Sequence, residues 1–352
     1  MPNKEYWGGI GFKKASVLTY DNQDLTDVME DLNEDMAFYD DMKSKFIDVL
    51  TESTDKYEIV RNRYASQPVP YAEGSKPNPF MNKVDFIQQI PFQEYQEGLN
   101  ITSRAIQTMT AEQVSAFVNA KLTALEAQRY SDFRKAVFTN TVDEILDSMG
   151  QYRVRREPFY NGQGLDTLIP VPGYKFKAGD DQHFNAVGTA NVITDREIRE
   201  LLIDKVRHHG YTGVELHVNT YDYYLEELQL FVPRQDQIGS SSEVNRGPIV
   251  GTSDSLYDGH IGWIMNAPVI KSDLVPQGYI MAVGMANTPG MKPLYYRTHP
   301  LGLNGLQLVV RNDKFPFENT IMTDGWGFAP ANRGGVAVLQ ITDTTYNVPD
   351  EL

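Results

Sequence analysis

The hydrophobic and polar positions of the chain follow a helical period in three places. Between Asp24 and about Thr51, apolar residues recur at steps of three and four, and acidic residues occupy the opposite face. This arrangement predicts an amphipathic helix. We expect its acidic face to be solvated; a cation site and a partner-binding face are the alternatives. Residues 1–22, which precede the helix, show no period and predict an arm.

The second helical pattern is the longest. It begins with a capping box, TAEQ, in which Thr110 and Gln113 close the first turn. Apolar residues continue at helical spacing to Met149, and Gly150 occupies the position of a C′ glycine. An unbroken helix would span about 40 residues, roughly 60 Å; a break at TNT (139–141) would give two consecutive helices. The apolar stripe is not a clean heptad, which favours a helix lying along a sheet over a coiled coil.

The third helical pattern opens with another capping box, TDRE (194–197), and runs into RHHG. Alternation over 212–219 then predicts a half-buried strand. A short helix is expected at 223–230, and the polar segment 234–260 has the composition of an exposed loop. The segments YIMAVGMA, LQLVV and VAVLQIT predict strands in the C-terminal part of the chain.

Residues 57–93 predict a β-hairpin that cannot stand alone. Two β-prone runs flank the tip AEGSKPNP, which is built from turn-forming residues. Neither run holds enough apolar residues to bury a core, and an isolated hairpin is marginally stable in water. The hairpin therefore needs another surface to lie on, and another subunit could supply it.

Composition then narrows the class of protein. No apolar run approaches the roughly 18 residues of a membrane span, and the first residues lack the apolar stretch of a signal peptide. The absence of cysteine excludes disulfides and thiolate chemistry. A net charge of −15 argues against binding nucleic acid by affinity, because such binding needs clustered lysine and arginine.

The strongest candidate for chemistry is a run of histidines. Three of the six histidines, His208, His209 and His217, lie within ten residues. Because histidine is the commonest metal ligand and general base, these residues with Glu215 are a candidate site of a metal-dependent hydrolase. The spacing lacks a motif such as HExxH, and His208 and His209 fall in the last turn of a predicted helix, before Gly210. We interpret them as the end of that helix.

The other motifs are weaker evidence for a functional site. WGGIGFKKAS lacks the spacing of a phosphate-binding loop, and DDQHFNAVG has acidic residues but not the alternate-position pattern of a calcium loop. No nucleophile motif is present. We therefore predict no catalytic residue, cofactor or metal site, and a protein that is not an enzyme.

The order of the elements resembles the major capsid proteins of tailed bacteriophages, which share the Hong Kong 97-type fold. The stretch PFQEYQEGLNITSRAIQ…KAVF (91–138) is similar to that family's passage from extended loop into spine helix. ANVITDREIREL…LFVP (190–233) resembles the peripheral-domain helix, its GY exit and the following strand. GHIGWIMNAP…YIMAV (259–283) resembles a stretch of the axial domain, and 292–342 resembles the closing strands.

The resemblance implies an α+β, Hong Kong 97-like capsid fold with five parts. These are an N-terminal arm and helix (1–56), an extended β-hairpin loop (57–93), the spine helix with the first part of the peripheral domain (94–221), the axial domain (222–322), and the return strand of the peripheral domain (323–352).

The resemblance also implies a structural function. Such a protein self-assembles as pentamers and hexamers into the icosahedral head of the virion, in the host cytoplasm, and encloses double-stranded DNA without sequence-specific binding. Scaffold, decoration, portal and maturation proteins are the implied partners, and no membrane is involved. Intersubunit contacts are expected at the tip of the extended loop: Ala72, Glu73, Gly74, Ser75, Lys76 and Pro77.

Two further expectations come from the same resemblance. Some members of the family seal the shell with a Lys–Asn isopeptide bond, for which Lys76 or Lys83 is the candidate here. An encapsulin-type compartment, which shares the fold but holds a protein cargo, is the nearest alternative function. The long segment at 234–260 and the N-terminal arm favour the phage protein.

Overall fold

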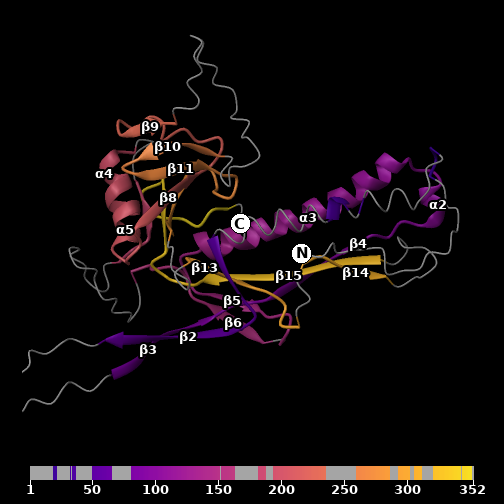
Figure 1. Ribbon diagram of the computed structural model, residues 1–352, viewed down its shortest axis with the longest axis horizontal. Coiled ribbons are helices and arrows are strands. Elements are labelled where there is room, and N and C mark those ends of the chain that lie inside the picture. Colours follow the sequence, from indigo (N-terminus) through magenta and orange to yellow (C-terminus); the bar gives the residue numbers. More distant parts are fainter. Residues whose placement is uncertain are drawn as a thin grey trace, which may run out of the picture.

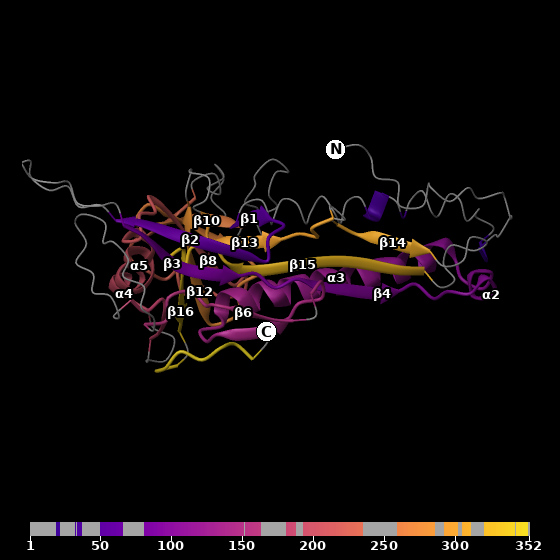
Figure 2. The same cartoon turned by 90° about the horizontal axis from the view of Figure 1, so that it is seen from below.

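The molecule is elongated, with a compact sheet unit at one end and a long limb of helix and strands at the other (Figures 1 and 2). A computed structural model describes residues 19–21, 32, 34–36, 50–65, 81–150, 152–162, 181–187, 193–234, 259–285, 292–301, 305–310, 320–341 and 343–350.

The sheet unit is built on a seven-stranded sheet in the order β7-β16-β12-β8-β11-β10-β9. The strands are β7 (Phe184–Ala186), β8 (Gly213–Val218), β9 (Phe231–Pro233), β10 (His260–Ile264), β11 (Ala267–Lys271), β12 (Tyr279–Met285) and β16 (Val336–Gln340). The predicted strands in YIMAVGMA and VAVLQIT are thus confirmed as β12 and β16.

The central strand β8 is buried on both faces, so the predicted half-buried strand at 212–219 is wrong in that respect. Its even-numbered residues face the helix that precedes it, within an apolar cluster that includes Leu202. Its odd-numbered residues share the other face with Met281, which packs against the end of the long helix. Because both faces of the strand are covered, the alternation of polar and apolar residues in its sequence does not identify a solvent-exposed face.

The helix before β8 begins where the sequence predicts. The Thr194 hydroxyl accepts the backbone N–H of Glu197, and the Glu197 carboxylate accepts that of Thr194, which completes the capping box. The helical segment consists of α4 (Asp195–Glu197), a π-helical stretch (Ile198–Ile203) and α5 (Asp204–Arg207). It ends at Gly210, whose φ of 97° only glycine adopts readily.

The short helix expected at 223–230 is absent, and the segment forms successive turns instead. Its backbone bonds run from one residue to the third before it, as from the Glu226 N–H to the Tyr223 carbonyl. Leu225 is buried in the core beneath, and the chain enters β9 at Phe231. Each of the backbone bonds closes a separate turn, so the four-residue bonds of an α-helix do not form in this segment.

The limb consists of a long helix on a second sheet. Strand β15 (Thr320–Pro330) is its axis and pairs with β13, β14 and β4, while β13 also pairs with β1. Helix α3 (Ala111–Phe138) contacts β15 and β4, as the sequence predicts for a helix lying along a sheet. The other elements are β1 (Thr51–Thr54), β4 (Gln93–Gly98), α2 (Ser103–Ile106), β13 (Leu294–Arg297) and β14 (Gln307–Val310), the last being the predicted strand LQLVV.

Helix α3 has the predicted beginning but a different end. Both hydrogen bonds of the Thr110 capping box are present. The helix stops at Phe138, at the predicted break, because Thr139 is extended (φ −78°, ψ 121°). The chain then forms strand β5 (Asp143–Leu146), paired with β6 (Arg153–Arg156). A helix continuing to Met149, a second helix after TNT and a C′ role for Gly150 are therefore all wrong. The burial of β5 alternates with period two, which is the strand pattern.

The predicted hairpin is confirmed in its two strands. Strands β2 (Glu58–Ala65) and β3 (Met81–Gln89) are antiparallel and project from the body below the sheet unit (Figure 1). The predicted tip residues Ala72 to Pro77, with Lys76 among them, lie outside the described residues.

The N-terminal helix predicted over 24–51 is described in part. Leu32 and Met36 are helical and fully buried in a cluster with Val114 and Val118 of α3. The chain is already in strand β1 at Thr51. The remainder of that helix, most of the arm at 1–22 and the segment 235–258 lie outside the described residues.

The predicted domain ranges stay a prediction. Strands β8 and β16 both pair with β12 in the seven-stranded sheet, although the ranges 94–221, 222–322 and 323–352 assign the three strands to three different parts.

Candidate functional site

The first candidate site is the hairpin, whose base is fixed to the body. Ile90, the residue after β3, is fully buried with Tyr295 and Ala329, and Ile59 of β2 packs against this cluster. The Arg297 guanidinium forms a buried ion pair with Asp147 and donates to the Ile90 carbonyl at 2.7 Å. These contacts hold the root of the hairpin at a defined angle.

The hairpin carries exposed apolar surface near its root. Val60 and Ile87 are a cross-strand pair, and they are 45 % and 48 % exposed. An exposed pair of branched aliphatic side chains on a projecting two-stranded ribbon is a surface suited to contact with another molecule.

The limb contains buried polar contacts that are structural in character. Arg129 of α3 forms an ion pair with Asp324 of β15, 2.9 Å from nitrogen to oxygen, and both side chains are at most 3 % exposed. The Asp132 carboxylate accepts hydrogen bonds from the Tyr95 hydroxyl at 2.6 Å and from the Trp326 indole at 2.9 Å. Burial, together with the bond to Asp132, raises the pKa of Tyr95. These contacts fix α3 on its sheet.

A polar hollow beside this network is lined by charges that pair among themselves. Arg156 lies 2.8 Å from Asp143, and Lys135 lies 3.9 Å from Asp132. Glu144 also lines the hollow and is paired with Arg153 on the neighbouring strand, 3.6 Å away, so each charge of the lining has a partner.

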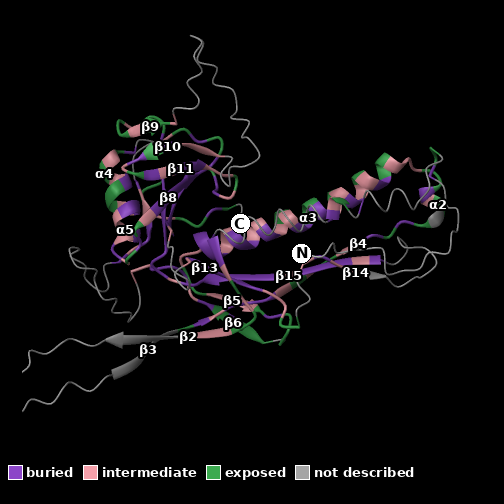
Figure 3. Ribbon diagram, viewed as in Figure 1, coloured by how far each residue is buried: buried purple, intermediate pink, exposed green. Residues whose placement is uncertain are grey.

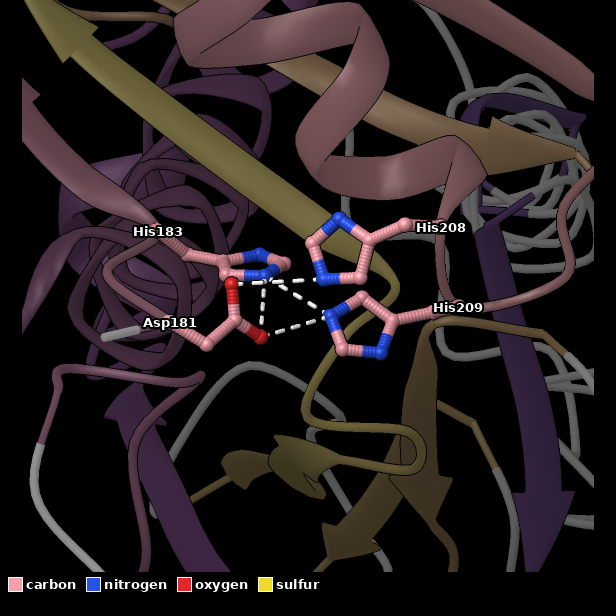
Figure 4. A group of neighbouring side chains, drawn as sticks. All are labelled: Asp181, His183, His208 and His209. Carbon is pink, nitrogen blue, oxygen red and sulfur yellow. Dashed lines mark hydrogen bonds and ion pairs between the residues drawn. The ribbon is translucent and has the colours of Figure 1, made fainter. Parts of the chain in front are cut away.

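The second candidate site lies where β7 meets the end of α5 (Figure 4). Asp181, just before β7, has its carboxylate next to three imidazoles: His209 Nε2 at 2.8 Å, His183 Nε2 at 3.2 Å and His208 Nε2 at 3.3 Å. The Nε2 atoms of His183 and His209 are 3.0 Å apart. One ligand atom from each residue lies within 4.8 Å of all the others, and all four side chains are at most 9 % exposed.

The backbone fixes the orientation of two of these rings. His183 Nδ1 lies 2.7 Å from the Val336 carbonyl, and His208 Nδ1 lies 2.9 Å from the Asp204 carbonyl. A carbonyl can only accept, so each Nδ1 carries the hydrogen. The Nε2 atoms of His183 and His208 are therefore the ring nitrogens that face Asp181.

The protonation of the cluster is determined by its burial. Burial lowers the pKa of His209 to about 4, even though the Asp181 carboxylate acts in the opposite direction. Burial alone would raise the pKa of Asp181, but hydrogen bonding to His183, His208 and His209 outweighs it and places that pKa well below its usual range. At neutral pH the centre thus holds a carboxylate and a neutral His209.

The structure brings together only two of the four candidate residues that the sequence suggested. His208 and His209 end the helix as interpreted, but they also meet Asp181 and His183. His217 and Glu215 are not in this cluster; they lie on β8 as a separate buried pair, 3.6 Å apart. A proposed hydrolase centre of His208, His209, His217 and Glu215 is therefore wrong.

Asp181 and His183 are the residues that the sequence interpretation missed. They lie in DDQHFNAVG, whose acidic residues invite comparison with a calcium loop and lack its pattern. The usable signal was the Asp-x-His spacing at the start of an extended segment, since residues two apart on a strand point to the same side.

Comparison with known proteins gives a fold but no close relative. No family model matches the chain, and no curated protein matches it. A solved structure from Mycobacterium phage Patience is similar over 96 % of this chain and 93 % of its own, with a TM-score of 0.62 and 19 % identity.

Weaker likenesses include the bacteriophage PhiM1 mature capsid, at 10 % identity over 86 % of this chain and 87 % of that one, with a TM-score of 0.45. The SrpI encapsulin complex from Synechococcus elongatus has 12 % identity over 87 % of this chain and 90 % of that one, with a TM-score of 0.41. Likenesses at this level do not distinguish a phage shell from an encapsulin.

The fold is that of a phage capsid protein, as the resemblance in sequence predicts. Among the described helices, none is both long enough and apolar enough to span a bilayer.

Proposed function

We propose that this chain is the major capsid protein of a tailed phage and acts as a structural protein rather than as an enzyme. It assembles with itself into pentamers and hexamers that close into an icosahedral head around double-stranded DNA. The fold similarity across the whole chain supports the class of function. The observation that carries the assembly proposal is the hairpin: a ribbon fixed at its root that carries an exposed apolar pair, Val60 and Ile87.

In this proposal the hairpin lies on a neighbouring subunit, with contacts at its tip from Ala72 to Pro77, and α3 serves as the spine helix. A two-stranded ribbon needs a covering surface for stability, and a neighbouring subunit supplies it. The chain's charge of −15 keeps the inner wall from adhering to DNA, which a packaging motor must be able to move. Scaffold, decoration, portal and maturation proteins are the proposed partners, and the virion is the proposed location.

The enzyme alternative has little support from the geometry. A catalytic zinc site keeps a position open for water or substrate. The cluster around Asp181 already has four converging ligand atoms in a buried setting, and His217 is paired with Glu215 elsewhere.

The proposal can be tested by electron microscopy and sedimentation of the full-length chain, expressed with and without its scaffold. Replacing residues 66–80 by a short Gly-Ser turn should leave soluble subunits that form no closed shells. A matched variant with a Gly-Ser turn in place of 236–257, the other long segment, should still assemble. Normal shells from the hairpin variant would contradict the proposed contact.

A point variant sharpens the same test. Ile87→Asp should abolish or strongly reduce assembly, because it places a charge in the proposed contact. Leu146→Asp, at a 60 % exposed position on β5, is the control and should assemble normally. Shells that contain packaged protein instead of DNA would favour the encapsulin alternative over the phage head.

A further inference from the structure

We propose that Asp181, His183, His208 and His209 bind one zinc ion. This inference is independent of shell formation and rests on the geometry of the cluster. Zinc bonds to imidazole nitrogen at about 2.0–2.1 Å, and a tetrahedron of such bonds separates ligand atoms by about 3.3–3.4 Å. His209 and His183 Nε2 lie 2.8 and 3.2 Å from Asp181 Oδ2 and 3.0 Å from each other, so these three atoms need outward shifts of only a few tenths of an ångström. His208 Nε2 lies 3.3 Å from the other oxygen, Oδ1, and the four ligand atoms lie within 4.8 Å of one another, so the ion would draw His208 toward the other three.

The surroundings of the rings match those of metal ligands. A metal-binding histidine usually donates its second ring N–H to a carbonyl or carboxylate, which fixes the tautomer and the ring orientation. His183 and His208 meet this condition through the carbonyls of Val336 and Asp204. These bonds turn the Nε2 atoms of both rings toward the Asp181 carboxylate, so the ligand atoms converge on one point, as a bound cation requires.

The donor set selects the ion. Three imidazole nitrogens and one carboxylate oxygen suit zinc and neighbouring transition metals, whereas calcium and magnesium prefer oxygen ligands. With four protein ligands and no open position, the centre is of the structural kind and would not activate water.

Two positively charged side chains near the cluster, Lys205 and Arg333, act against the binding of a cation. Lys205 Nζ lies 3.5 Å from Asp181 Oδ1, and its side chain is 21 % exposed, so the ammonium group can turn toward water. The Arg333 guanidinium stacks 4.9 Å from the Tyr160 ring, which in turn stacks on His209. Arg333 is held there by its bond to the Pro158 carbonyl at 2.8 Å.

Zinc here would fasten an edge of the seven-stranded sheet. Strand β7 has three residues and pairs only with β16 among the described strands. His183 and His209 are 26 residues apart in the sequence, so the ion would close a loop between β7 and the end of α5. Since such a site does not exist in the unfolded chain, its binding free energy would add to the stability of the sheet unit.

The test uses the full-length chain, stripped with chelator and then titrated with Zn²⁺ or Co²⁺. We expect about one ion per chain, a higher melting temperature with zinc, and the strong visible absorption of tetrahedral cobalt. Asp181→Asn and His208→Gln should each weaken binding by more than about 100-fold, beyond the effect of losing an outer partner. Lys205→Ala should bind zinc more tightly than the wild type.

His217→Gln is the matched control, because it removes a buried histidine of the same sheet unit outside the cluster. It should keep both the stoichiometry and the cobalt spectrum. Failure of the wild-type chain to bind either ion, a six-coordinate cobalt spectrum, or equal binding by Asp181→Asn would overturn the proposal. Metal binding by the wild-type chain tests the zinc proposal even if a variant fails to fold. The measurement does not depend on shell assembly.

Discussion

The two ends of the molecule are stabilised by different kinds of interaction. In the sheet unit, β8, β12 and β16 are buried on both faces (Figure 3). The core between the sheet and its helix is mainly aliphatic, with Tyr211 as its buried aromatic residue. In the limb, the buried face of α3 includes Arg129 and Asp132 beside its apolar residues. Apolar burial is strong but non-directional, whereas buried ion pairs and hydrogen bonds require one geometry. In the limb, the position of α3 on its sheet is therefore specified by polar contacts as well as by apolar packing.

The largest expected effect comes from breaking the ion pair of the limb. Arg129→Met leaves the Asp324 carboxylate buried without the guanidinium 2.9 Å away, and Asp324 is fully buried at its side chain. We expect a loss of about 3–5 kcal/mol in the free energy of unfolding, measured by urea denaturation of the unassembled chain.

A second variant separates the charge from the packing. Arg129→Met combined with Asp324→Asn removes both charges and should recover most of the loss, because no uncompensated charge then remains buried. If the double variant is as unstable as the single one, the limb depends on the packing of Arg129 over the Trp326 ring, 4.7 Å away, rather than on the ion pair.

A matched pair of leucines compares the apolar cores of the two regions. Leu202 is fully buried between helix and sheet in the sheet unit, and Leu122 is 5 % exposed on α3 in the limb. Leu202→Ala should cost about 3–4 kcal/mol and Leu122→Ala about 2–3 kcal/mol, because a narrow limb can relax around the cavity more easily. Denaturation gives the free energies, and hydrogen exchange of the β8 and α3 amides shows which region loosens. Equal costs would mean that the limb packs as rigidly as the sheet unit.

The sequence predicted the features that local contacts determine. The capping boxes at Thr110 and Thr194 each involve four consecutive residues, and both formed as predicted. The long helix was predicted from its periodicity, and the hairpin strands from two β-prone runs on either side of turn-forming residues. The order of the elements along the chain was also sufficient to predict the capsid fold.

The features that failed depend on strand order and distant contacts. That β8 is central, and so covered on both faces, results from its pairing with β11 and β12, which no local pattern encodes. Helical spacing continued past Thr139 by chance, and the pairing of β5 with β6 decided the structure there. His183 joins His209 from 26 residues away, so the cluster became visible only with the fold.

The smallest expected effect concerns the junction of the two regions at alkaline pH. Tyr279 begins β12 and packs edge-on against Phe138, the last residue of α3, with ring centres 5.8 Å apart. Burial raises the pKa of Tyr279 to about 12, so the unfolded chain loses this proton first as the pH rises. The stabilising contribution is therefore complete below pH 10 and is lost as the pH approaches and passes 12. We expect a difference of about 1–2 kcal/mol, because two pKa units are partly offset by contact with water.

The measurement for this junction is the stability of the wild type minus that of Tyr279→Phe, by urea denaturation at several values of pH. That difference should shrink between pH 10 and 12, as the sign of the pKa shift requires. Tyr221→Phe, at a 72 % exposed tyrosine, should show no such change. A wild-type advantage that stays constant across this range would mean that Tyr279 ionises in the folded chain as it does in the unfolded one, and that the junction is open to water.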